Sequence, residues 1–223
     1  MSEKGNQAVK TVSFMMLITL FGKILGMVRE QLLAANYGTD MQAAAFLLAS
    51  RIPRTFFDVI FASAISASFI PVFVEYLQKK GRQEAFSLAN RFITMISTVT
   101  LLMMLLGMAF AKPLTLLIAP GYDVETVTLC VGLLRMLFPT MLFTAVAFSF
   151  VGILQSLEEF NVPAALSVVS NGVLILYYIF FNEKFGILGL TVAFLIGWAM
   201  QAVIQIPSLW KKGYHYHPDF HFK

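Results

Sequence analysis

The chain has few charged residues and a single cysteine. Asp, Glu, Lys and Arg make up 13% of its 223 residues, about half the share usual in a soluble domain, whereas 58% of the residues are hydrophobic. The one cysteine, Cys130, excludes an internal disulfide framework and a thiolate metal site. Because the apolar excess runs along the whole chain, the sequence predicts a polytopic, all-α membrane protein rather than a soluble domain with one anchor.

The sequence also lacks the motifs of common catalytic and nucleotide-binding sites. It contains no HExxH, no GxSxG, no Walker A sequence and no Asp-rich diphosphate motif. We therefore expect no enzymatic activity, no catalytic residue, no cofactor and no nucleic-acid partner. Three histidines near the C-terminus, His215, His217 and His221, lack an accompanying Cys or acid pattern. We expect an interfacial loop or linker there rather than a metal site.

Six apolar segments exceed the ~20 residues that are needed to cross the hydrocarbon layer of a bilayer. They cover approximately residues 10–36, 41–75, 84–112, 124–154, 162–182 and 186–210. Turn sequences separate them, and no soluble domain fits between any two. We therefore predict a six-helix transmembrane bundle over residues 1–210, followed by a cytoplasmic interfacial tail or linker over residues 211–223.

The distribution of Lys and Arg predicts the orientation of this bundle. The termini and the even-numbered turns hold most of the cations near the segment ends: Lys4, Lys10, Lys79, Lys80, Arg82, Lys211, Lys212 and Lys223. The odd-numbered turns contain only Lys112 and Lys184. By the positive-inside rule, both termini are cytoplasmic. The first apolar run lacks a clean A-x-A cleavage site, so we expect a retained helix rather than a signal peptide.

The first membrane segment carries ionisable residues on one broad side. At about 100° per residue, Lys23, Gly26 and Glu30 form one stripe, and Gly22, Gly26 and Arg29 form the adjacent one. The two glycines permit close approach of another helix or of a ligand. Charges restricted to one side are typical of a helix that lines a water-filled cavity. The alternative is that these side chains snorkel to the membrane surface.

The second segment repeats the pattern with Arg51, Arg54 and Asp58. Arg54 and Asp58 are four residues apart and can form an ion pair within the helix, so a structural role is as well supported as a functional one. Arg51 has no obvious acid partner. A run of small residues follows and predicts a helix-packing face: Ala62, Ser63, Ala64, Ser66, Ala67 and Ser68.

Cations outnumber acids at membrane depth, with Lys23, Arg29, Arg51, Arg54 and Arg135 against Glu30 and Asp58. A basic cavity inside the membrane suits an anionic substrate, and the planar guanidinium group suits phosphate in particular. Asn171, Gln201 and Gln205 are the other polar candidates. The candidate substrate-binding residues are therefore Lys23, Gly26, Arg29, Glu30, Arg51, Arg54 and Arg135.

Five stretches, in this order, resemble the N-terminal half of the MurJ (MviN) family of lipid II flippases: GKILGMVREQLLAANYG, FLLASRIPRTFFDVIFASAISASFIPVFVEY, APGYD, LLRMLFPTML and GILQSLEEFNVPA. The resemblance covers nearly the whole chain. It implies membership of the multidrug/oligosaccharidyl-lipid/polysaccharide exporter superfamily, in which helices 1–6 of fourteen form the N-lobe. It also implies alternating access in the bacterial cytoplasmic membrane, around a cationic cavity that takes the pyrophosphate and sugars of lipid II, a polyprenyl-linked peptidoglycan precursor.

The resemblance assigns the first-helix pattern of the family, Arg-x-Leu-Gly-x-x-Arg-Asp, to Lys23, Leu25, Gly26, Arg29 and Glu30. Lys and Glu here replace the usual Arg and Asp, which keeps the charges. The basic residue before the second-helix proline is Arg51. An acid of the family pattern is replaced by Ala44, which is compatible with a divergent member or an engineered substitution.

By the same resemblance, the chain ends where the seventh helix of the family would begin. Six helices would supply one wall of the cavity, and that wall would need a separate C-lobe or a second copy of the chain as a partner. We therefore expect that the chain alone does not flip lipid. Two other functions remain open: a flippase of another polyprenyl-linked oligosaccharide, such as an O-antigen or capsule unit, and a non-transporting membrane scaffold.

Overall fold

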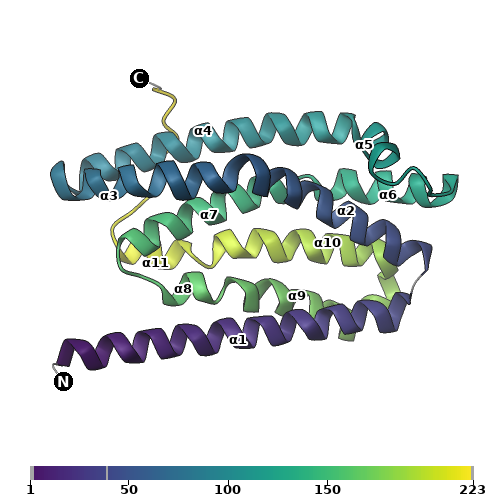
Figure 1. Cartoon of the computed structure of the whole chain (residues 1–223), viewed down its shortest axis with the longest axis horizontal. Coiled ribbons are helices and arrows are strands. Elements are labelled where there is room, and N and C mark those ends of the chain that lie inside the picture. The colour runs from purple at the N-terminus through teal and green to yellow at the C-terminus, as the bar shows by residue number, and fades with distance from the viewer. Residues whose placement is uncertain (1–2, 39, 222–223) are drawn as a thin grey trace.

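The computed structural model describes residues 3–38 and 40–221, and these residues form helices and turns with no β-strand. Six helical segments within them are long and apolar enough to span a membrane, which confirms the predicted number. The segments are Val12–Tyr37, Met41–Lys79, Arg82–Ala109, Val124–Ser156, Asn161–Phe180 and Asn182–Lys211. They run side by side in one bundle (Figure 1). Lys223, counted above towards the orientation, lies outside the described residues.

Four of the six segments contain more than one helix. The first three segments contain α1 (Glu3–Tyr37), α2 (Met41–Phe57), two π-helices (η1, Asp58–Ala62; η2, Ala64–Phe69), α3 (Ile70–Lys79) and α4 (Arg82–Ala109), and a short α5 (Ala111–Ile118) follows. The last three contain α6 (Val124–Leu137), α7 (Thr140–Ser156), α8 (Asn161–Ala164), α9 (Leu166–Phe180), α10 (Asn182–Val203) and α11 (Ile206–Lys211). The predicted segments therefore agree in order, but not in their internal breaks.

Proline accounts for some of these breaks but not for all. Pro139 separates α6 from α7, and Pro163 lies in the short α8. Proline has no backbone donor and its ring crowds the preceding turn, so a helix tends to end or bend there. Pro53, in contrast, lies inside α2 without interrupting it. At the break after α4, Phe110 leaves helical geometry with φ −93° and ψ 16°, and Pro113 follows in the first turn of α5.

The long second segment widens into π-helix in its middle. On an α-helix, side chains four residues apart drift by about 40° at each step. The wider turn of the π-helix, closed by i→i+5 bonds, reduces that drift. A row of large side chains therefore stays on one buried face: Phe57, Phe61, Ile65, Phe69 and Phe73.

This arrangement corrects the predicted packing face of the second segment. The small residues Ser63, Ser66, Ala67 and Ser68 are exposed, and the aromatic row on the opposite side makes the contacts with the rest of the chain. The prediction was wrong because small residues permit close packing but contribute little apolar area themselves. Larger side chains at the same helical spacing bury more surface.

Helix α1 lies at one edge of the bundle, beside α8 and α9 (Figure 1). Gly22 makes this contact close, because a Cβ atom built on it would lie 2.2 Å from the Ser167 Oγ atom. This confirms that the glycine admits another helix, and identifies that helix as α9. The other faces of α1 are open, with Met16 and Met27 each about two-thirds exposed (67% and 65%).

The C-terminal tail is bound along α4 rather than lying free. The Tyr214 ring is buried against Phe86, and its hydroxyl donates to Asn90 Oδ1 at 2.8 Å. Further along, Asp219 accepts from Arg91 Nε at 2.9 Å, and its backbone N–H donates to the hydroxyl of Thr94. These contacts fasten the tail across the first turns of α4.

Replacing Asp219 by Asn should release the end of this tail. The backbone N–H of His221 and the Arg91 guanidinium hold the pKa of Asp219 down to about 2. A carboxylate with a depressed pKa stabilises the docked state at neutral pH, and this stabilisation is lost as the pH falls from about 4 towards 2. Cleavage by chymotrypsin after Tyr216 should be faster in Asp219→Asn than in the parent chain at pH 7.

A matched control is Asp123→Asn, which alters the carboxylate that caps α6 through the backbone N–H groups of Glu125 and Thr126. This variant should leave cleavage of the tail unchanged. Equal cleavage of the parent chain and Asp219→Asn would show that the ion pair does not hold the tail.

Candidate functional site

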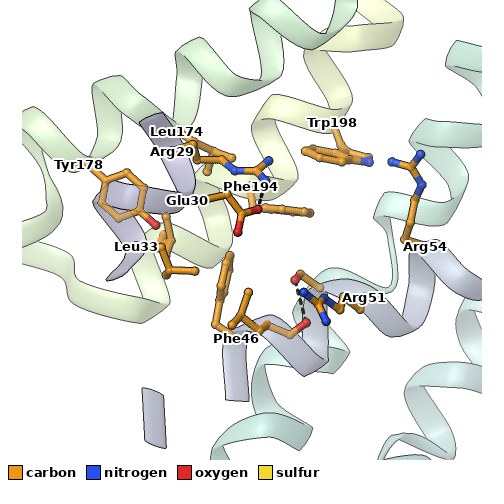
Figure 2. Close-up of a pocket in the computed structure, with 13 residues that line it drawn as sticks. Arg29, Glu30, Leu33, Phe46, Arg51, Arg54, Leu174, Tyr178, Phe194 and Trp198 are labelled. Atoms are coloured by element: carbon orange, nitrogen blue, oxygen red, sulfur yellow. Dashed lines mark hydrogen bonds and ion pairs between the residues drawn. The ribbon is translucent and has the colours of Figure 1, made fainter. Parts of the chain in front are cut away.

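A cavity of about 210 Å³ lies between α1, α2, α9 and α10. Figure 2 shows that side chains from these four helices converge on it. Its lining is Arg29, Glu30, Leu33, Phe46, Leu47, Ser50, Arg51, Arg54, Leu174, Tyr178, Leu190, Phe194 and Trp198. Four of the seven residues predicted from the sequence therefore line one cavity: Arg29, Glu30, Arg51 and Arg54.

The charges of the cavity are only partly compensated. Arg29 Nη2 donates to Glu30 Oε1 at 2.7 Å. Arg54 Nε lies 3.1 Å from Asp58 Oδ2, which confirms the ion pair that was predicted within the second segment. Among the described residues, Arg51 forms no ion pair. The cavity therefore has a net positive charge, and a cleft lined by one sign of charge attracts ions of the opposite sign.

Asn171 of α9 positions Arg29. Its Oδ1 atom accepts from Arg29 Nη1 at 3.0 Å, and its Nδ2 donates to the Gly22 carbonyl at 3.1 Å. The amide is buried, with 7% of the residue exposed. One side chain thus joins α9 to the backbone of α1 and to the arginine that α1 directs into the cavity. We infer that the close contact at Gly22 and the orientation of Arg29 depend on each other.

A second, larger cavity of about 530 Å³ adjoins the first. The two share Arg29, Arg54 and Trp198. The second extends towards Met15 and Thr19 of α1 and towards α8, and it contains polar side chains: Thr19, Gln155, Ser167, Ser170, Asn171 and Gln201. Two arginines and an indole ring therefore lie at the junction of the two spaces.

The other three predicted residues are not in the lining of the first cavity. Gly26 lies beside Asn171, and a Cβ atom built on it would be 3.4 Å from the amide nitrogen. Lys23 is exposed and lines neither cavity. Arg135 is also outside both cavities, and its Nε donates to the Met108 carbonyl at the end of α4, at 3.2 Å.

The site residues predicted from the sequence did not include Trp198 or Tyr178, although each lines the first cavity. Trp198 stacks on Phe194, with ring centroids 4.2 Å apart. Aromatic residues are frequent in membrane helices, so neither stood out from the sequence. Asn171 was visible as a polar residue inside an apolar segment, but nothing in its surroundings linked it to Arg29.

Six candidate membrane spans, with an arginine-lined cavity between four of their helices, define a multi-pass membrane protein. A family model described as "Lipid II flippase MurJ" matches residues 33–223. The chain belongs to this family.

Known proteins of the family match this chain over most of its length. A probable lipid II flippase MurJ of Buchnera aphidicola (subspecies Acyrthosiphon pisum) is 31% identical over 92% of the chain and 41% of its own length. The lipid II flippase MurJ of Burkholderia cenocepacia is 26% identical over 86% of the chain and 38% of its own length. The chain therefore spans about two fifths of the curated relatives that it matches.

Solved structures agree with this assignment. A lipid II flippase MurJ in an inward closed conformation superposes with a TM-score of 0.76 at 27% identity, over 91% of this chain and 42% of that one. A transporter of the MOP superfamily from Pyrococcus furiosus superposes with a TM-score of 0.72 at 14% identity, over 95% of this chain and 47% of that one. The second likeness shows a shared fold. The chain thus matches less than half of each of these solved chains.

Proposed function

We propose that this chain is the N-lobe of a transporter, not an enzyme, and that the whole protein moves lipid II from the cytoplasmic to the outer leaflet of the bacterial inner membrane. The observation that carries the proposal is the convergence of Arg29, Arg51 and Arg54 on one cavity inside the bundle. The family relation supports lipid II as the substrate, since the relatives are named for it.

The cavity suits the pyrophosphate group of such a lipid. Guanidinium groups bind phosphate oxygens through two parallel N–H donors, and Arg51 has no acid partner among the described residues. A volume of about 210 Å³ is below the ~300–1,000 Å³ of pockets that hold drug-sized ligands. The first cavity therefore accommodates the pyrophosphate, while the adjoining polar cavity of about 530 Å³ has room for part of the sugar.

Transport through this cavity requires a second half of the protein that faces it. Transporters of this general design move two halves against each other around a site near the bilayer midplane. Arg51 and Arg54 line the cavity from a surface of α2 that is exposed in this chain. We propose that a C-lobe covers this surface and completes the cavity, and that Lys23 then becomes part of it.

Complementation tests the proposed function. This chain, joined to the C-terminal part of the Burkholderia cenocepacia flippase, should support growth of a bacterium depleted of its own lipid II flippase. The same fusion with Arg51→Ala should be inserted in the membrane at the same level but fail to support growth. Rescue of a strain that lacks an O-antigen flippase, without rescue of the first strain, would assign a different polyprenyl-linked sugar.

We further propose that both termini are cytoplasmic, from the excess of Lys and Arg in the even-numbered turns. In a chain with Cys130→Ala, a membrane-impermeant maleimide added to intact cells should label Gly121→Cys but not Lys80→Cys. Labelling of both after lysis is the control for access to each site. The reverse pattern would overturn the orientation.

A further inference from the structure

An apolar groove of about 270 Å³ lies apart from the cationic site. It runs along the second half of α4 and reaches α5 and the junction of α6 and α7, and it shares no residue with either of the two cavities. Its walls include Met103, Leu106, Phe110, Leu114 and Phe138. Nearly all of its surface is hydrocarbon, so it suits an apolar ligand.

Gly107 forms the floor of the groove. A Cβ atom built on it would lie 2.2 Å from the Phe138 ring, so only glycine lets this ring lie against α4. Leu106 and Phe110 beside it are 58% and 57% exposed. The groove is therefore hollowed into the outer surface of the bundle, where lipid chains are the surrounding solvent.

Arg135 stands at the end of this groove. It precedes Phe138 by one turn, and its Nε donates to the carbonyl of Met108, the residue next to Gly107. That bond caps α4 where the helix breaks before α5. The side chain is exposed, and in the part of the chain that the structure describes it forms no ion pair. Its two terminal nitrogens remain available to an anion. Lys112, one residue into α5, is a second exposed cation at the same break.

A guanidinium group on a lipid-facing surface is costly unless it reaches the interface or finds a counter-charge. The phosphate of a membrane lipid is the anion that every bilayer offers at this surface, and basic positions between helices select anionic headgroups. We propose that the break between α4 and α5 binds one phospholipid with an anionic headgroup. Arg135 holds its phosphate, and one acyl chain lies in the groove over Gly107.

Native mass spectrometry of the purified chain with phosphatidylglycerol or phosphatidylcholine tests this site. The parent chain should retain phosphatidylglycerol more tightly. Arg135→Gln should lower the affinity for phosphatidylglycerol by about fivefold and lower that for phosphatidylcholine less, because the choline cation already offsets the charge of its phosphate. Arg135→Lys, which keeps the charge, should retain part of the preference even if capping of α4 is weakened.

The groove is tested separately with Leu106→Trp, which should fill it and weaken retention of both lipids. Leu105→Trp, on the opposite side of α4 at a similar exposure of 53%, is the matched control and should have no effect. Lys184→Gln controls for removal of a positive charge elsewhere. No preference in the parent chain, an unchanged preference in Arg135→Gln, or equal losses in Lys184→Gln would each overturn the proposal.

Discussion

Replacing Arg29 by Ala should abolish transport by a full-length flippase that carries this N-lobe, without loss of folded protein. Arg29 contributes to both cavities and is fixed by Glu30 and Asn171. Hydrogen bonds to charged groups contribute about 1.5–3 kcal/mol, so binding of a polyprenyl pyrophosphate should weaken by roughly 10- to 150-fold. Growth complementation and ligand titration of the purified protein both measure this.

Two control variants test whether the loss of transport is specific to the guanidinium group of Arg29. Arg29→Lys keeps the charge but loses the planar pair of donors, so it should retain part of the activity. Arg82→Ala removes an arginine that lines neither cavity and should be neutral. If Arg29→Ala binds the lipid as well as the parent, the cavity is not the pyrophosphate site.

Gly22→Leu should cause the largest loss of stability among substitutions in α1. A Cβ atom at this position already meets Ser167 Oγ at 2.2 Å and Ser167 Cβ at 3.2 Å, so a larger side chain must push α1 away from α9. Overpacking costs about 1–3 kcal/mol, which corresponds to an apparent melting temperature roughly 2–12 °C lower. Separation of the helices would also break the contacts of Asn171 with Gly22 and Arg29.

Gly172→Leu is the matched control, because this glycine lies in α9 and a Cβ atom there meets nothing within 4 Å. We expect a small change in melting temperature and normal ligand binding for that variant. Comparable destabilisation by both substitutions would show that leucine itself is poorly tolerated in this region, and not that Gly22 forms a specific contact.

The bundle was predictable because the bilayer imposes a length on every apolar segment. Six segments were expected and six are present. The internal breaks were harder to predict, since Pro53 continues a helix whereas Pro139 separates two helices. Their effects depend on neighbours that are distant in sequence, such as Arg135 at the end of α4. The π-helices left no recognisable signal, because they depend on backbone bonds rather than on residue type.

The sequence predicted those residues of the candidate site that form clusters of charge within an apolar segment. Arg29, Glu30, Arg51 and Arg54 lie on adjacent helices at similar depth, and the structure brings them to one cavity. Lys23 was placed on the stripe of Glu30, but its side chain is exposed and lines neither cavity. Arg135 could not be assigned, because helical periodicity gives the face of a residue but not the helix that it meets.

Titration of the purified chain in lipid nanodiscs with a polyprenyl pyrophosphate tests the central claim most directly, with the corresponding polyprenyl alcohol as the control ligand. The pyrophosphate should bind, the alcohol should bind much more weakly, and Arg29→Ala and Arg51→Ala should each reduce binding of the pyrophosphate alone. Equal binding of the two ligands, or pyrophosphate binding unaffected by both substitutions, would contradict the assignment of this cationic cavity as the binding site of a lipid flippase.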